Sequence, residues 1–120
     1  MKPKCIVGMS RYHDIAVFDM NNKLLFSGQS HRLKRFTKGM KILRFYVSDQ
    51  CDLSKCISLS APINIIAEEV WRKYFVLNKV SDNSTRQKVL KIIPEAKLSI
   101  SSSEAEAALI GLIGIGRKLS

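Results

Sequence analysis

The densest group of chemically active side chains in this chain is basic. Six positive residues fall between positions 32 and 44, at Arg32, Lys34, Arg35, Lys38, Lys41 and Arg44. Ammonium and guanidinium groups spaced along one segment are suited to contacting successive phosphates of a nucleic-acid backbone. If all six neutralised phosphates, log affinity would fall against log salt concentration with a slope of roughly −5. The plainer interpretation of the same segment is a solvated loop.

The net charge of the whole chain also favours binding to nucleic acid. Its 120 residues contain 20 Lys and Arg against 10 Asp and Glu, a formal net charge of +10. So large an excess on a small body creates a positive surface potential that attracts polyanions, of which nucleic acid is the commonest. A charge that serves solubility, or a structural role of the ribosomal kind, is the alternative. The length predicts a single domain over residues 1–120.

The three cysteines do not indicate a metal site or disulfides. Cys51 and Cys56 lack a second pair of ligands for zinc, and Cys5 has no local support for a catalytic dyad with His13. We therefore expect reduced thiols and an intracellular, reducing compartment: cytoplasm, nucleus or organelle matrix. The first residues do not read as a secretion signal and no apolar stretch approaches 18 residues, so we expect neither secretion nor a membrane partner.

Short apolar runs separated by turn residues predict the elements that must position these groups. Asn21-Asn22 marks a tight turn, so the first three runs predict an antiparallel meander. The stretch 29–41 predicts a loop or short irregular helix, and the glycines at 111, 114 and 116 should weaken the end of the last helix. Strands are expected at 5–7, 15–20, 23–27, 42–47 and 63–66, and helices at 52–61, 68–77, 85–93 and from 101 onward. This order predicts an α/β fold with a mixed five-stranded sheet flanked by helices.

An ordered set of motifs resembles the RuvC-type Holliday-junction resolvases of the ribonuclease H-like superfamily. The opening IVGMSRYHDIAVFDMNNKLLFSG is similar to the family's first three strands, and FYVSDQ to the end of its fourth. Trp71, Arg72, Lys73 and Phe75 match a Trp-Lys-Lys-x-Phe segment, and SSEAEAALIGLIGIG resembles the last helix. The resemblance spans nearly the whole chain, which is shorter than usual for the family. It implies a ribonuclease H-like domain.

The resemblance also implies phosphodiester hydrolysis, with three or four carboxylates holding two Mg²⁺ or Mn²⁺ ions about 4 Å apart. The family's last acid falls on Glu106, and its fourth-strand acid falls near Ser48 or Asp49. Its first-strand Asp falls near Met9 or Ser10, neither of which can replace it, and Asp14 is the nearest acid. The candidate catalytic residues are thus Asp14, Asp49 and Glu106, with Asp49 and Glu106 as metal ligands.

Each of these acids also has a structural interpretation. Asp14 could form a turn, Asp49 could simply end a strand, and Glu106 could stabilise the dipole of the last helix from its first turn. Because the first-strand acid is missing, our leading hypothesis is a domain that binds branched or duplex nucleic acid with weak or lost nuclease activity. The alternatives are an active, Mg-dependent junction resolvase, and a structural component of a ribonucleoprotein such as an organellar ribosome.

The remaining predictions concern partners and core. Branched DNA is the favoured partner and RNA is possible, as is a homodimer or a ribonucleoprotein assembly. Trp71 and Phe75 are expected in the core, and His13 and His31 at the surface. We expect the basic run to lie beside the acidic site, with the nucleic-acid-binding set consisting of Arg32, Lys34, Arg35, Lys38, Lys41, Arg44, Arg72, Lys73 and Arg86.

Overall fold

All five predicted strands are present, each within two residues of its expected bounds. The computed structural model describes residues 2–52, 54, 61–75 and 82–116. Gly28 continues the third strand, whereas we expected it to end that strand. Most of the helix predicted at 52–61 lies outside the described residues. The elements are β1 (Lys4–Met9), β2 (Asp14–Asp19), β3 (Leu24–Gln29), a 3₁₀ turn η1 (Ser30–Arg32), α1 (Leu33–Phe36), β4 (Lys41–Ser48), β5 (Ile63–Ile66), α2 (Glu68–Tyr74), α3 (Asp82–Ile92) and α4 (Ser102–Ile115).

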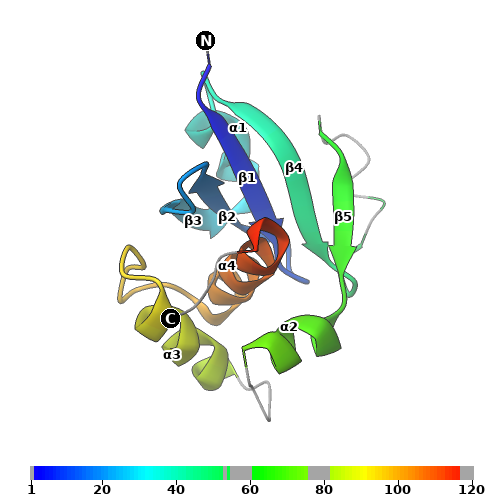
Figure 1. Ribbon diagram of the computed structural model, residues 1–120, viewed down its shortest axis with the longest axis vertical. Helices are drawn as coiled ribbons and strands as arrows, with labels where there is room; N and C mark the ends of the chain where they lie inside the picture. Colours follow the sequence, from blue (N-terminus) through cyan, green and yellow to red (C-terminus); the bar gives the residue numbers. More distant parts are fainter. Residues whose placement is uncertain (1, 53, 55–60, 76–81, 117–120) are drawn as a thin grey trace.

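The five strands form one mixed sheet in the order β3-β2-β1-β4-β5. β1, β2 and β3 pair antiparallel, which confirms the predicted meander, and the Asn21-Asn22 turn places Asn22 at a φ of 64°. β4 then pairs parallel to β1, and β5 pairs parallel to β4 (Figure 1). The carboxyl ends of β1, β4 and β5 therefore meet at one edge of the sheet, from which α2 begins. The fold is thus the expected α/β class with a mixed five-stranded sheet flanked by helices.

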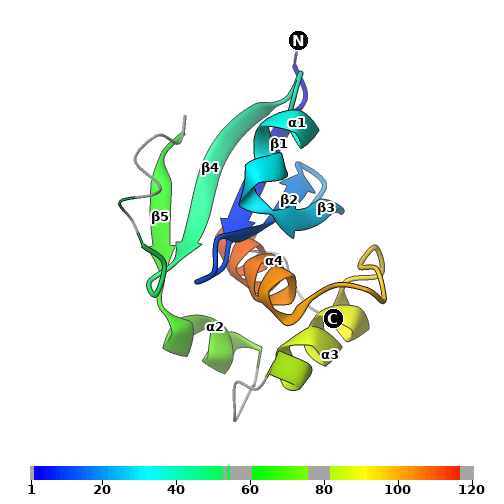
Figure 2. The ribbon, with the colours of Figure 1, turned by 180° about the vertical axis from the view of Figure 1, so that it is seen from behind.

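Alternate residues of the central strands pack on opposite faces of the sheet, because successive side chains of a strand point to opposite sides. On one face, Ile6, Phe18 and Tyr46 pack against α4. On the other face, Val7, Val17 and Phe45 pack with Leu33 of α1. Figures 1 and 2, seen from opposite sides, show α4 and α1 on the two faces. Both faces of β1, β2 and β4 are covered, which explains why the sequences of these strands are continuous apolar runs.

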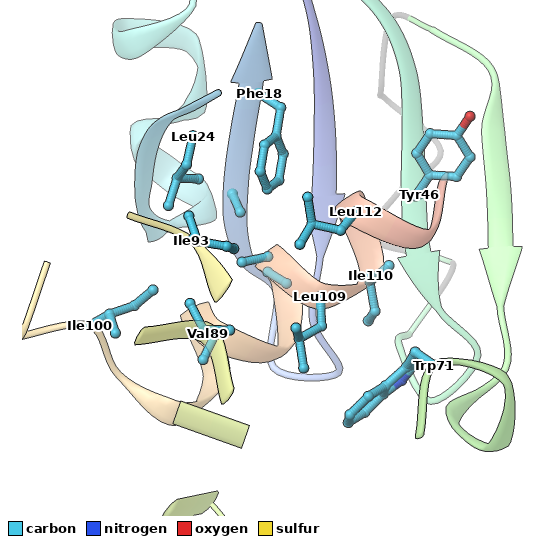
Figure 3. Close-up of a cluster of buried hydrophobic side chains, with 14 of the residues drawn as sticks. Phe18, Leu24, Tyr46, Trp71, Val89, Ile93, Ile100, Leu109, Ile110 and Leu112 are labelled. Carbon is cyan, nitrogen blue, oxygen red and sulfur yellow. The ribbon is translucent and has the colours of Figure 1, made fainter. Parts of the chain in front are cut away.

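The larger cluster joins α4 to α2 and α3 as well as to the sheet. Trp71 and Phe75 are buried in it, as the sequence predicted. Figure 3 shows how α4 occupies the centre of this cluster, with contributions from Phe18, Leu24, Tyr46, Trp71, Val89, Ile93, Ile100, Leu109, Ile110 and Leu112. The chain between α3 and α4 is held by Arg86, whose guanidinium donates to the carbonyl oxygens of Leu98 and Ile100.

Glycines allow α4 to approach the sheet closely. A Cβ atom on Gly8 of β1 would lie 2.2 Å from the carbonyl oxygen of Ala107, and one on Gly114 would overlap the ring of Tyr46. A Cβ atom on Gly111 would lie 2.8 Å from Cε2 of the Phe18 ring. Gly111 and Gly114 are therefore packing positions, a role that the sequence analysis did not predict. Gly116 has a φ of 65° and provides the left-handed C-cap.

The side chains of Cys5 and Cys51 are buried, and burial raises the pKa of the Cys5 thiol. Among the described residues, no helix is both long and apolar enough to cross a bilayer.

Candidate functional site

The turn that follows β1 connects the sheet to the start of α4. The hydroxyl of Ser10 is fully buried and lies 2.7 Å from the hydroxyl of Ser103. The same Ser10 oxygen accepts hydrogen bonds from the backbone N–H groups of Tyr12 (3.3 Å) and Asp14 (3.1 Å). His13 completes the turn at a φ of 64°. Ser10 therefore fixes a tight turn at the position where the resemblance requires a carboxylate.

Arg11, the next residue of this turn, lies between two carboxylates. Its Nε donates to Oε1 of Glu106 at 2.9 Å, and its backbone N–H donates to Oε2 of the same residue at 2.8 Å. Its Nη2 donates to Oε1 of Glu68, the first residue of α2, at 2.7 Å. One guanidinium thus joins acids from two helices, and both oxygens of Glu106 accept hydrogen bonds from Arg11.

The electrostatics of this group favour a permanently charged arginine. Burial opposes the charge of Arg11, but the hydrogen bond with Glu68 and the attraction of Glu106 outweigh it, so the pKa of Arg11 is raised. The side chain of Glu106 is only 8% exposed, whereas those of Arg11 and Glu68 are 25% and 26% exposed. Burial of an acid is tolerated where a cation and hydrogen bonds compensate it, as Arg11 does here. A pocket of about 110 Å³ opens beside these side chains, lined also by Tyr12 and Ser103.

Glu106 does not occupy the position that the dipole interpretation required. α4 begins at Ser102, and Ser101 is its N-cap, accepting a hydrogen bond from the N–H of Glu104 at 3.1 Å. Glu104 is the acid in the first turn, and Glu106 lies beyond it with its side chain buried. The partner of Glu106 is therefore Arg11 and not the helix terminus.

The other two predicted acids lie at the margin of this group. Asp49, exposed at the end of β4, accepts from the backbone N–H of Glu68 at 3.3 Å and so holds the start of α2. Hydrogen bonds link Asp49 to Glu106 through Glu68 and Arg11. Asp14 begins β2 beside the amino end of α4. Burial raises the pKa of Asp14, a hydrogen bond with Ser103 opposes that rise, and the charge of Glu104 adds to it.

These residues do not fit a two-metal site of the kind that the resemblance implies. Among the described residues, no three or more His, Cys, Asp and Glu side chains are grouped to hold a metal ion. More directly, Arg11 already supplies the positive charge between Glu68 and Glu106. Ser10 stands where the resemblance places the first-strand Asp, and a serine hydroxyl is not a strong metal ligand. The donor set around Arg11 is therefore that of an ion-pair network and not that of a pair of dications.

The predicted basic residues separate into two regions. Those at 32–41 lie on η1, α1, the turn after α1 and the amino end of β4. Arg72 and Lys73 lie on α2, beyond the carboxyl ends of the parallel strands (Figure 1). β4 is eight residues long, so Lys41 and Ser48 are separated by about 23 Å. α1 packs on the face opposite α4, so this run does not lie beside Glu106 as we expected. Arg44, exposed on β4, donates to the hydroxyl of Tyr46 at 3.4 Å, and Arg86 is engaged in holding the loop before α4.

Sequence reasoning missed three members of this site: Arg11, Glu68 and the Ser10–Ser103 contact. Arg11 offered one signal, because it is a cation that directly follows the position of the missing first-strand acid. Glu68 offered none beyond its place at the start of a predicted helix.

Compared with known proteins, the chain matches no protein-family model and no curated protein.

Proposed function

We propose that this chain is a ribonuclease H-like domain of the RuvC type that binds nucleic acid without cutting it. The observation that carries the proposal is the position of Arg11 between Glu68 and Glu106. A resolvase needs clustered negative charge there to hold two dications. An arginine side chain cancels one of the two charges and occupies the carboxylate oxygens, so the site keeps its fold-stabilising role and loses its affinity for metal.

Two further observations support this proposal. The antiparallel meander followed by β4, β5 and the helices has the element order that the resemblance implies. The net charge of +10 and the exposed cations of η1, α1 and β4 supply a surface for phosphates. Phosphate contacts need no metal and position a strand or duplex without reading its sequence.

Binding of labelled nucleic acids in EDTA tests this proposal. The probes are a four-way DNA junction, a duplex of the same sequence, and single strands of DNA and RNA, titrated by fluorescence anisotropy at several salt concentrations. We expect binding in EDTA that magnesium does not strengthen, and a log–log salt slope approaching −5 if all six cations at 32–44 contact phosphates. The double variant Lys34→Gln/Lys38→Gln should flatten this slope by about 2, whereas Lys97→Gln, an exposed lysine between α3 and α4, should leave it unchanged.

Absence of binding to every probe at low salt would end the proposal. Binding to RNA alone, with co-sedimentation of the protein on ribosomal particles, would replace it with the structural ribonucleoprotein hypothesis.

A further inference from the structure

A second pocket lies away from Arg11, on the face of the sheet opposite α4. It has a volume of about 300 Å³ and is lined by Phe26 of β3, Arg32 of η1, and Arg35 and Phe36 of α1. None of these residues takes part in the Arg11 group. The four lining residues are two aromatic rings and two guanidinium groups, a combination suited to a flat, negatively charged ligand.

The two rings form an aromatic platform that remains partly exposed. Phe26 and Phe36 stack with their centroids 4.3 Å apart and their planes at 21°. The ring of Phe26 lies over Gly28, where a Cβ atom would come within 2.7 Å of its Cζ. Gly28 thus leaves room for this ring on an edge strand, and neither ring is fully buried. Both rings pack against the core on this face of the sheet and still line the pocket, so part of each ring is open to a ligand.

The cations around this platform are available to a ligand. The guanidinium carbon of Arg32 lies 5.7 Å from the centroid of the Phe26 ring, and Arg35 is exposed on α1. In the described part of the chain neither arginine forms an ion pair. Lys34, Lys38 and Lys41 continue the positive charge along the same segment. Arginine beside an aromatic face suits a base and its phosphate together, because the ring stacks and the guanidinium binds the anion.

We propose that this pocket binds one unpaired nucleobase of a nucleic-acid strand, with the base against the Phe26–Phe36 platform and its flanking phosphates on Arg32 and Arg35. The inference rests on the proposed function and gives it a specific ligand. A base inside a duplex has both faces covered by its neighbours, so only an unpaired base can stack on a protein ring. The domain should therefore prefer nucleic acid with unpaired positions over a continuous duplex.

Matched probes test the unpaired base directly. The intact protein is titrated, in EDTA at constant salt, against a DNA duplex, the same duplex with one bulged thymidine, and the same bulge with an abasic site. Stacking of one base predicts that the bulged probe binds about 5- to 150-fold more tightly than its abasic counterpart. A matched set of RNA probes shows whether the affinity depends on the sugar of the nucleic acid.

Variants assign that preference to the platform. Phe36→Leu keeps an apolar side chain but removes the ring, so it should abolish the difference between bulged and abasic probes while keeping affinity for the duplex. Phe26→Leu should have the same effect. It replaces Phe36→Leu in the test if circular dichroism shows that Phe36→Leu is unfolded. Arg35→Gln should weaken all three probes, and Lys97→Gln should change none.

Each outcome bears on a different claim. If wild-type protein binds the duplex but does not distinguish bulged from abasic probes, or if the folded Phe36→Leu variant keeps the distinction, the base pocket is wrong and the proposed function stands. If wild-type protein binds no probe at all, both fail.

Discussion

Replacing Arg11 with methionine should destabilise the protein by about 2–4 kcal/mol at pH 7. The change keeps the aliphatic length but removes the hydrogen bonds from Nε to Glu106 (2.9 Å) and from Nη2 to Glu68 (2.7 Å). A hydrogen bond to a charged group contributes roughly 1.5–3 kcal/mol. Arg11 and Glu68 are each about a quarter exposed, so the hydrogen bond between them should contribute no more than the lower limit of this range. Removing Arg11 leaves Glu106 with a buried, unpaired charge, which accounts for most of the expected loss.

Urea denaturation followed by circular dichroism measures this loss, with Lys73→Met as the control. Lys73 is an exposed cation on α2, so its replacement should change the free energy of unfolding by less than about 0.5 kcal/mol. In a double-mutant cycle, Arg11→Met with Glu106→Gln should be less destabilised than the sum of the single variants, by roughly 1.5–3 kcal/mol.

A loss below about 1 kcal/mol, with additive single variants, would refute this reasoning. Arg11 would then be one more surface ion pair, and the carboxylates beside it would be available to a metal.

Three further predictions concern the surroundings of this site and the core. Burial raises the pKa of Asp14, so its ionised form opposes folding, and Asp14→Asn should be more stable than wild type at pH 7. The gain in the urea midpoint should shrink as the pH falls through the raised pKa and vanish below about pH 3, where the carboxyl is protonated in both states. Gly8→Ala should cost at least about 1–3 kcal/mol in the same denaturation assay, because its Cβ would meet the backbone of Ala107 at 2.2 Å. Trp71→Ala should cost roughly 3–5 kcal/mol yet leave the affinity of the folded fraction for DNA unchanged, since the indole is fully buried.

Local sequence patterns were sufficient to predict most of the elements. Strands appear as apolar runs because both faces of β1, β2 and β4 are covered, and Asn21-Asn22 marks the turn between β2 and β3. The last helix was expected from residue 101 onward, and Ser101 is its N-cap, accepting a hydrogen bond from the N–H of Glu104. These signals involve residues close in sequence, so no tertiary structure is needed to interpret them.

The site could not be predicted in the same way, because its contacts join distant positions. Arg11 is 57 residues from Glu68 and 95 from Glu106, and no periodicity encodes such a contact. The position of Glu106 within its helix decided between dipole stabilisation and a buried ion pair, and a shift of a few residues in the helix start changes that answer. The Phe26–Phe36 stack likewise depends on how α1 folds back over β3.

Binding without cutting is tested most directly by incubating a labelled four-way DNA junction with the wild-type protein in Mn²⁺ and resolving the strands on a denaturing gel. We predict that every strand stays intact at protein concentrations that fully shift the junction on a native gel. Paired, metal-dependent nicks that disappear in Glu106→Gln would contradict the proposed function and identify an active resolvase.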